Sequence, residues 1–96
     1  MNLRTAAWMI GNGSRFRGHD IVCRIARRCR HAREKHPVFA EGLPQAVGVI
    51  AEEMRELEQA MLHEGPERTV EESLDVIATA IRLVNGEHEE SHGEKS

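Results

Sequence analysis

The sequence predicts an all-α protein, a helical bundle with three main helices per chain. Apolar residues recur at spacings of three and four in three stretches: from about residue 14 or 19 to 35, from 44 to about 64, and from between 66 and 70 to about 86. His36-Pro37 and Gly65-Pro66 separate these stretches, because the residue before a proline avoids the α region and glycine interrupts helices. No stretch shows the period-two alternation of a strand.

Two shorter segments flank the helical domain, which is expected to occupy residues 14–86. Residues 1–13 show no clear periodicity and end in the turn signal Gly11-Asn12-Gly13, so we expect an N-terminal arm or short packing segment. Residues 87–96 are polar, charged and glycine-containing, and a flexible tail is predicted there. A single domain of 96 residues has a thin core unless subunits associate.

Cellular location is predicted from what the chain carries near its N-terminus and from its cysteines. The apolar stretch at residues 6–10 is far shorter than a signal sequence or a membrane span requires. Cys23 and Cys29 lie six residues apart on a predicted helix, and neither metal-binding cysteine pairs nor redox motifs have this spacing. Both are therefore expected to be reduced thiols with a structural role. We therefore expect a cytoplasmic protein with no membrane partner.

Charge is divided unevenly along the chain. Residues 1–36 carry nine Arg and Lys against two acids, whereas residues 37–96 carry four against fourteen, so the two parts have net charges of about +7 and -10. The favoured explanation is that the basic segment lies against the acidic remainder, within the fold or in a partner subunit; nucleic-acid or phosphate binding is the alternative. An aromatic share of only 3% argues against stacking surfaces for single-stranded nucleic acid, so a nucleic-acid partner is not expected.

The second predicted helix carries acids at the margin of its apolar face. At about 100° per residue, Glu53 and Glu56 lie on the flank of that face, whereas Glu52 and Arg55 point further toward solvent. The apolar stripe itself is predicted to be the core face of the helix, and it comprises Leu43, Val47, Ile50, Met54, Leu57 and Met61.

The third predicted helix is apolar nearly all round. Its only polar strip is narrow and contains Glu72, Asp75, Thr79 and Arg82. A helix of this kind is expected to be buried on most sides, so it should pack against its own subunit and against a second one. The protein is therefore predicted to be a homodimer or homotetramer, with the bundle completed into a four-helix-type core by oligomerisation.

Two pairs of carboxylates share the same spacing of three residues, which places each pair on one helical face about 5 to 6 Å apart. The pairs are Glu53 with Glu56, and Glu72 with Asp75. If the two helices pack antiparallel across Gly65-Pro66, the pairs face each other, and an all-oxygen anionic cluster is what hard divalent cations such as Mg²⁺ bind.

Simpler explanations exist for individual acids. A solvated helix face accounts for Glu58, Glu64, Glu67 and Glu71. Thr69 and Glu72 also match a capping box, in which Glu72 would close a helix end. Neither explanation accounts for Asp75 on the polar strip of an apolar helix.

The acidic motifs resemble those of the MazG-like, all-α nucleoside triphosphate pyrophosphatase superfamily. The run Glu52-Glu53-Met54-Arg55-Glu56 is similar to its EExxE motif and Glu72-Ser73-Leu74-Asp75 to its ExxD motif, and fifteen residues separate the two. The resemblance covers about residues 35–86. It implies Mg²⁺, with Mn²⁺ as a substitute, held by Glu53, Glu56, Glu72 and Asp75, while Glu52 assists indirectly.

The resemblance also implies a reaction, in which water attacks the α-phosphorus of an NTP or dNTP to give a monophosphate and pyrophosphate. Glu53 or Glu56 would be the catalytic carboxylate that orients or deprotonates this water. Arg82 would grip a phosphate or neutralise the acids, Lys35 would reach the phosphates from another element, and Asn85 would contact the nucleotide. House-cleaning of non-canonical nucleotides is one role that such an activity would serve.

Two other functions remain open from the sequence. One is a phosphoribosyl-ATP pyrophosphohydrolase, an enzyme of similar size that shares the acidic motifs. The other is a non-catalytic oligomeric bundle in which the acids hold a cation or balance the arginines of the first helix.

Overall fold

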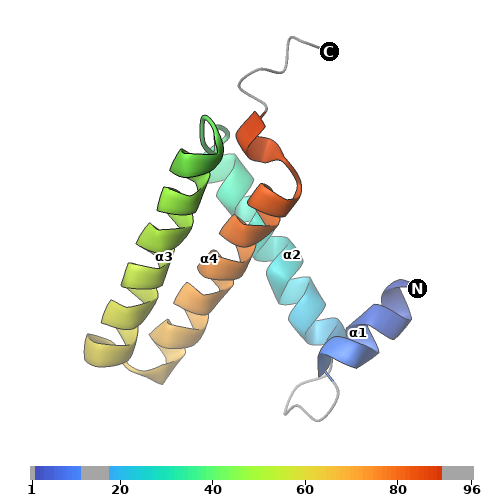
Figure 1. Ribbon diagram of the computed structural model, residues 1–96. Coiled ribbons are helices and arrows are strands. Elements are labelled where there is room, and N and C mark those ends of the chain that lie inside the picture. Colours follow the sequence, from blue (N-terminus) through green and yellow to red (C-terminus); the bar gives the residue numbers. More distant parts are fainter. Residues whose placement is uncertain (1, 12–17, 90–96) are drawn as a thin grey trace.

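The computed structural model describes residues 2–11 and 18–89, and within these ranges the chain forms four α-helices and no strand (Figure 1). The helices are α1 (Leu3–Gly11), α2 (Gly18–Lys35), α3 (Leu43–His63) and α4 (Pro66–Val84). The prediction of an all-α protein is therefore confirmed. The last three helices coincide closely with the three predicted from apolar periodicity.

The hairpin of α3 and α4 is the part of the fold that carries the acidic residues. Gly65 has φ of 98°, a left-handed conformation that a glycine adopts without strain, and Pro66 follows in the first turn of α4. The two helices run antiparallel and side by side, as expected (Figure 1). Ala46, Ala60 and Ala78 are almost fully buried, and such small side chains let the helix backbones approach closely.

Helix α4 is central, because it packs against α2 as well as against α3. It contributes more buried residues than any other helix in the described ranges. Ion pairs join α4 to α2. Arg24 and Arg28 of α2 both pair with Glu71, and Arg28 also pairs with Asp75. Three arginines of α2, Arg24, Arg28 and Arg33, thus pair within the chain with acids of its second part, as the favoured explanation of the charge division expects. Glu71, expected on a solvated face, is half-buried and paired with Arg24 and Arg28.

The N-terminal segment differs from the arm that the sequence suggested, because residues 3–11 form helix α1. This helix packs on the beginning of α2, where a Cβ at Gly18 would lie 1.4 Å from the carbonyl oxygen of Ala7. Leu3, Trp8 and Met9 remain mostly exposed. Leu3, Ala6, Ala7 and Ile10 recur at helical spacing, but nine residues make too few turns for this pattern to predict a helix on its own.

The C-terminal segment also differs from the predicted tail at its beginning. Residues 87–89 form a 3₁₀ turn, and the side chain of Glu87 is only 6% exposed. The backbone N–H of Gly42 donates a hydrogen bond to the carbonyl oxygen of His88, which ties this turn to the start of α3. The remainder of the predicted tail, residues 90–96, lies outside the described residues.

The apolar stripe predicted as the core face of α3 is largely exposed in the single chain. Its members Leu43, Val47, Met54 and Met61 are each about half exposed or more, whereas Ala46 and Ala60 face the packed side. Val70 and Ile77 of α4 are exposed as well, so one side of this helix lacks the cover that its sequence predicts. In the described residues, none of the helices has the length and apolar character needed to cross a membrane.

Candidate metal centre

Three of the four predicted ligands converge between α3 and α4. One carboxylate oxygen from each of Glu53, Glu56 and Glu72 lies within 4.8 Å of the other two. In an octahedral Mg²⁺ site, with Mg–O distances of 2.0 to 2.1 Å, oxygens on opposite sides of the ion are about 4.2 Å apart. Small side-chain rotations would therefore bring all three oxygens into one coordination shell.

Glu72 is the buried member of the cluster, with an exposure of 5%. Its Oε2 accepts a hydrogen bond from Arg68, but its Oε1 is buried without a hydrogen-bond partner. Burial raises the pKa of Glu72; Arg68 opposes this effect, and Asp75, Glu56 and Glu64 add to it. An unpaired buried carboxylate oxygen costs free energy, which a cation at this position would recover.

The capping-box explanation of Glu72 is wrong. Helix α4 begins at Pro66, with Gly65 at its N-cap, so Glu72 lies in the second turn rather than at the helix end. The hydroxyl of Thr69 donates to the carbonyl oxygen of Gly65 instead of capping a backbone N–H.

Glu53 has the most perturbed acidity of the cluster, since its pKa is raised from 4.5 to about 7. Desolvation is the largest cause, followed by the negative charges of Glu56, Asp75 and Glu72. Without a cation, burial and, to a smaller extent, the neighbouring negative charges favour a proton on Glu53 up to about neutral pH. The same crowding of negative charge favours a divalent cation over a proton once one is present.

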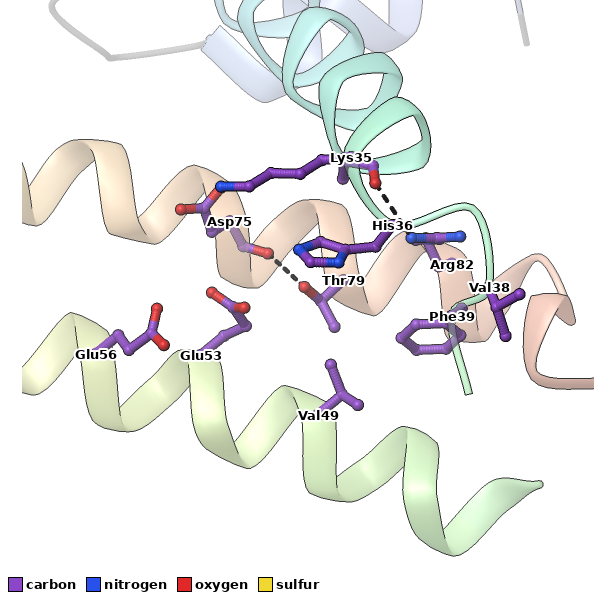
Figure 2. A pocket seen from close by; sticks show the side chains of 11 residues that line it. Lys35, His36, Val38, Phe39, Val49, Glu53, Glu56, Asp75, Thr79 and Arg82 are labelled. Atoms are coloured by element: carbon purple, nitrogen blue, oxygen red, sulfur yellow. Dashed lines mark hydrogen bonds between the residues drawn. The ribbon is translucent and has the colours of Figure 1, made fainter. Parts of the chain in front are cut away.

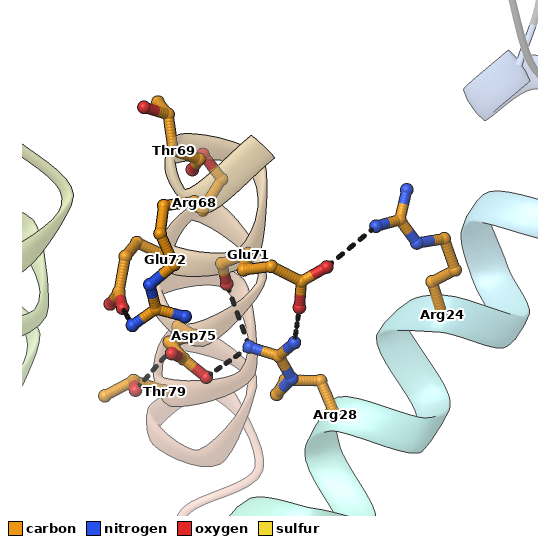
Figure 3. Close-up of polar contacts among 9 residues, drawn as sticks. Arg24, Arg28, Arg68, Thr69, Glu71, Glu72, Asp75 and Thr79 are labelled. Carbon is orange, nitrogen blue, oxygen red and sulfur yellow. Dashed lines mark hydrogen bonds and ion pairs between the residues drawn. The ribbon is translucent and has the colours of Figure 1, made fainter. Parts of the chain in front are cut away.

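Asp75 stands beside this group of three rather than within it. Its Oδ1 accepts a 2.8 Å hydrogen bond from Nη1 of Arg28 on α2 (Figure 3). It nevertheless lines the same cavity as Glu53 and Glu56. The structure therefore brings together three of the predicted ligands and places the fourth on the adjoining wall.

The cavity next to the cluster has a volume of about 410 Å³ and a polar and an apolar end (Figure 2). Glu53, Glu56 and Asp75 lie at the polar end, together with Lys35 from the end of α2. The apolar end is formed by Val38, Phe39 and Val49, the first two from the connection between α2 and α3. His36, Ala32, Thr79 and Arg82 complete the lining.

Of the three predicted substrate-binding residues, Lys35 and Arg82 line this cavity and Asn85 does not. Arg82 is 4% exposed, and Nε donates to Glu87 at 2.6 Å while Nη2 donates to the carbonyl oxygen of Pro37 at 3.2 Å. Its guanidinium carbon also lies 5.2 Å from the centre of the Phe39 ring. Arg82 thus pairs with Glu87 rather than with the predicted ligands, and Asn85 donates to the same carboxylate.

Two residues that pair with side chains lining the cavity, Glu87 with Arg82 and Arg28 with Asp75, were not found by sequence analysis. Burial acts to raise the pKa of Glu87, but hydrogen bonds from Arg33, Asn85 and Arg82 outweigh it and lower the pKa to about 2. Glu87 follows the last predicted helix in a polar, glycine-containing stretch that gives no sign of burial. Arg28 is one of five arginines in α2, and nothing in their spacing shows which of them faces Asp75.

Comparison with protein families, with curated proteins and with solved structures finds no match for this chain. A cluster of carboxylate oxygens without nitrogen or sulfur ligands suits a hard cation, and Mg²⁺ and Mn²⁺ are of this kind. A cation site that adjoins a cavity with a polar and an apolar end can hold an amphipathic anion.

Proposed function

We propose that the protein is a Mg²⁺-dependent nucleotide pyrophosphohydrolase, which converts an NTP or dNTP to the monophosphate and pyrophosphate. The observation that carries this proposal is the convergence of one carboxylate oxygen each from Glu53, Glu56 and Glu72, together with a buried Glu72 oxygen that has no hydrogen-bond partner. The resemblance of the acidic motifs to those of MazG-like enzymes agrees with it. Glu53, Glu56, Glu72 and Asp75 would hold the cation, with Mn²⁺ as a substitute for Mg²⁺.

The cavity suggests how a nucleotide would lie. Its phosphates would occupy the polar end, where Lys35 offers a positive charge. The base would contact Phe39 and Val49 at the apolar end. Arg82 would support this end through its position over the Phe39 ring, because most of its donors are already engaged with Glu87 and backbone carbonyls.

In the reaction, the oxygen of a water molecule would form a bond to the α-phosphorus as the bond to the bridging oxygen of the β-phosphate breaks. The cation, when bound, supplies charge neutralisation at the phosphate oxygens and a lower pKa of nearby water. Glu56 is exposed at the cavity, so it would accept the proton of the attacking water. Glu53 would orient that water.

The active form would be a homodimer or homotetramer. None of the large side chains in the described residues is fully buried in the single chain, while Val47, Met54 and Met61 of α3 and Ile77 of α4 are exposed on helices that carry the site. A second copy that covers these side chains would complete the core. Sedimentation velocity should show an oligomer for the wild type, and Met54→Glu should shift it toward the monomer.

The decisive experiment is a pyrophosphate-release assay with a panel of canonical and modified NTPs and dNTPs in the presence of Mg²⁺. The variant Glu56→Gln should lose activity by about 10²-fold or more with its helical content intact. Glu58→Gln is the matched control, because Glu58 is exposed on the same helix and is not a member of the cluster. Full activity of Glu56→Gln would contradict the assignment.

The same assay separates the other candidate functions. Turnover of phosphoribosyl-ATP with no turnover of NTPs or dNTPs would indicate the histidine-pathway type of enzyme. Cation binding without turnover of any of these nucleotides would indicate a non-catalytic bundle.

A further inference from the structure

Arg28 connects α2 to the helix that carries two of the proposed ligands. Its Nη1 donates to the carbonyl oxygen of Glu71 and to Oδ1 of Asp75, both at 2.8 Å, and its Nη2 donates to the carboxylate of Glu71 (Figure 3). The three acceptors lie on one turn of α4. Arg28 is 20% exposed, so solvent competes only partly for these hydrogen bonds.

This arrangement fixes the orientation of the Asp75 carboxylate. A guanidinium is planar and its donors have a fixed geometry, so three acceptors determine where its plane lies. Once that plane is fixed by Glu71, the hydrogen bond from Nη1 determines where Oδ1 of Asp75 lies. In the described residues, this is the one side-chain hydrogen bond to the Asp75 carboxylate, and the second oxygen remains available.

The negative charge of Glu71 also favours a cation near Asp75. Glu71 pairs with Arg28 and with Arg24, so it takes up part of the positive charge that would otherwise repel a metal ion. Asp75 lines the cavity next to Glu53 and Glu56. A carboxylate held through one oxygen by a hydrogen bond is a common arrangement for metal ligands, and loss of the supporting group typically weakens metal affinity 10- to 100-fold.

We propose that Arg28 is a positioning residue, which holds Asp75 on the cavity wall beside Glu53, Glu56 and Glu72, so that its second oxygen contributes to the cation site directly or through one of the waters that such a cation retains. The inference rests on the proposed function in that it takes this cluster to be a cation site. Arg28 itself contacts neither the cation nor the nucleotide. It acts through Asp75 alone.

The test measures Mn²⁺ binding without nucleotide, by isothermal titration of the full chain. Arg28→Lys keeps the positive charge but lacks the planar fork, and we expect about 10-fold weaker Mn²⁺ binding. Asp75→Asn should weaken binding at least as much. The double variant should bind no more weakly than Asp75→Asn, because Arg28 acts through that residue.

Glu71→Gln is the matched control for a purely structural role. It removes the negative charge that pairs with Arg24 and Arg28, but the backbone carbonyl and the side-chain amide oxygen can still accept hydrogen bonds from Arg28, so the guanidinium plane and the hydrogen bond to Asp75 are kept. Because the lost charge belongs to a residue outside the carboxylate cluster, we expect its Mn²⁺ affinity to fall by less than about 3-fold, even if its melting temperature falls as far as that of Arg28→Lys.

Three outcomes would overturn the inference: unchanged or tighter Mn²⁺ binding by Arg28→Lys, equal losses in Arg28→Lys and Glu71→Gln, or additive losses in the double variant. Should Arg28→Lys unfold, the comparison of Asp75→Asn with Glu71→Gln decides the matter, since equal affinities would show that Asp75 is not a ligand. Pyrophosphate release is assayed separately, so Mn²⁺ binding that follows the expected pattern without turnover would reject the enzymatic proposal alone.

Discussion

Replacement of Glu53 by glutamine should stabilise the cation-free protein at pH 8, although it removes a residue of the proposed site. The pKa of Glu53 is raised from 4.5 to about 7, first by desolvation and then by neighbouring acids. A raised pKa of a carboxyl group means that the folded protein holds its proton more tightly than the unfolded chain. Its contribution to stability is therefore fully present below pH 4.5 and is lost as the pH rises through about 7.

The magnitude follows from the size of this difference. At about 1.4 kcal/mol per pH unit, a rise from 4.5 to about 7 corresponds to an upper limit of about 3.5 kcal/mol. Because Glu53 is only half-buried and solvent screens its neighbours, we expect Glu53→Gln to gain about 1 to 2 kcal/mol at pH 8. The gain should vanish near pH 4, where the wild-type side chain is protonated in both states.

Urea denaturation in the presence of EDTA, at pH 4 and pH 8, measures this gain. Glu58→Gln is the control for charge removal, since Glu58 is exposed on the same helix. Addition of Mg²⁺ at pH 8 should reverse the order, because the cation stabilises the wild type and not the variant. The reasoning is refuted if Glu53→Gln is destabilised at pH 8 without a cation, or if its gain is the same at both pH values.

Three further perturbations test other parts of the structure. Mg²⁺ at ten times its dissociation constant should stabilise the wild type by about 1.4 kcal/mol, and differential scanning calorimetry should detect no such shift for Glu72→Gln. Glu87→Gln should lower the free energy of unfolding by about 2 to 4 kcal/mol at pH 7, because buried Arg82 loses its charged partner. The pKa of Glu87 is lowered to about 2, so urea denaturation should show a smaller difference between variant and wild type as the pH falls from 4.5 through 2. Gly18→Ala should separate α1 from α2, because the added Cβ would lie 1.4 Å from the Ala7 carbonyl oxygen, and hydrogen exchange in α1 should become faster without a comparable change in α4.

The positions of the acidic residues could be predicted from the sequence because they depend on local geometry. A spacing of three residues places Glu53 next to Glu56 on any helix, and the Gly65-Pro66 connection makes the hairpin antiparallel. These two facts suffice to bring Glu72 opposite the first pair. The place of Asp75, beside the cluster of Glu53, Glu56 and Glu72 and not within it, could not be predicted from local geometry. Its carboxylate is held by Arg28, which belongs to another helix.

Features that depend on distant contacts were missed for the same reason. Glu87 belongs to a polar stretch, and only the fold places it between Arg33 and Arg82. Helix α1 is short and contacts only α2 among the described helices, and an apolar pattern over nine residues does not by itself predict a helix. The sequence shows an apolar stripe on α3, but the single chain leaves two of its members, Met54 and Met61, exposed. That a second copy of the chain covers them stays a prediction.

Titration of the cation-free protein with Mn²⁺, followed by the electron paramagnetic resonance signal of the free ion, tests the central claim most directly. The account predicts saturable binding by the wild type and by Glu67→Gln, whose side chain is exposed on the same helix as Glu72. Glu72→Gln should bind at least about tenfold more weakly. Equal binding by all three proteins would show that the carboxylates between α3 and α4 do not hold a divalent cation.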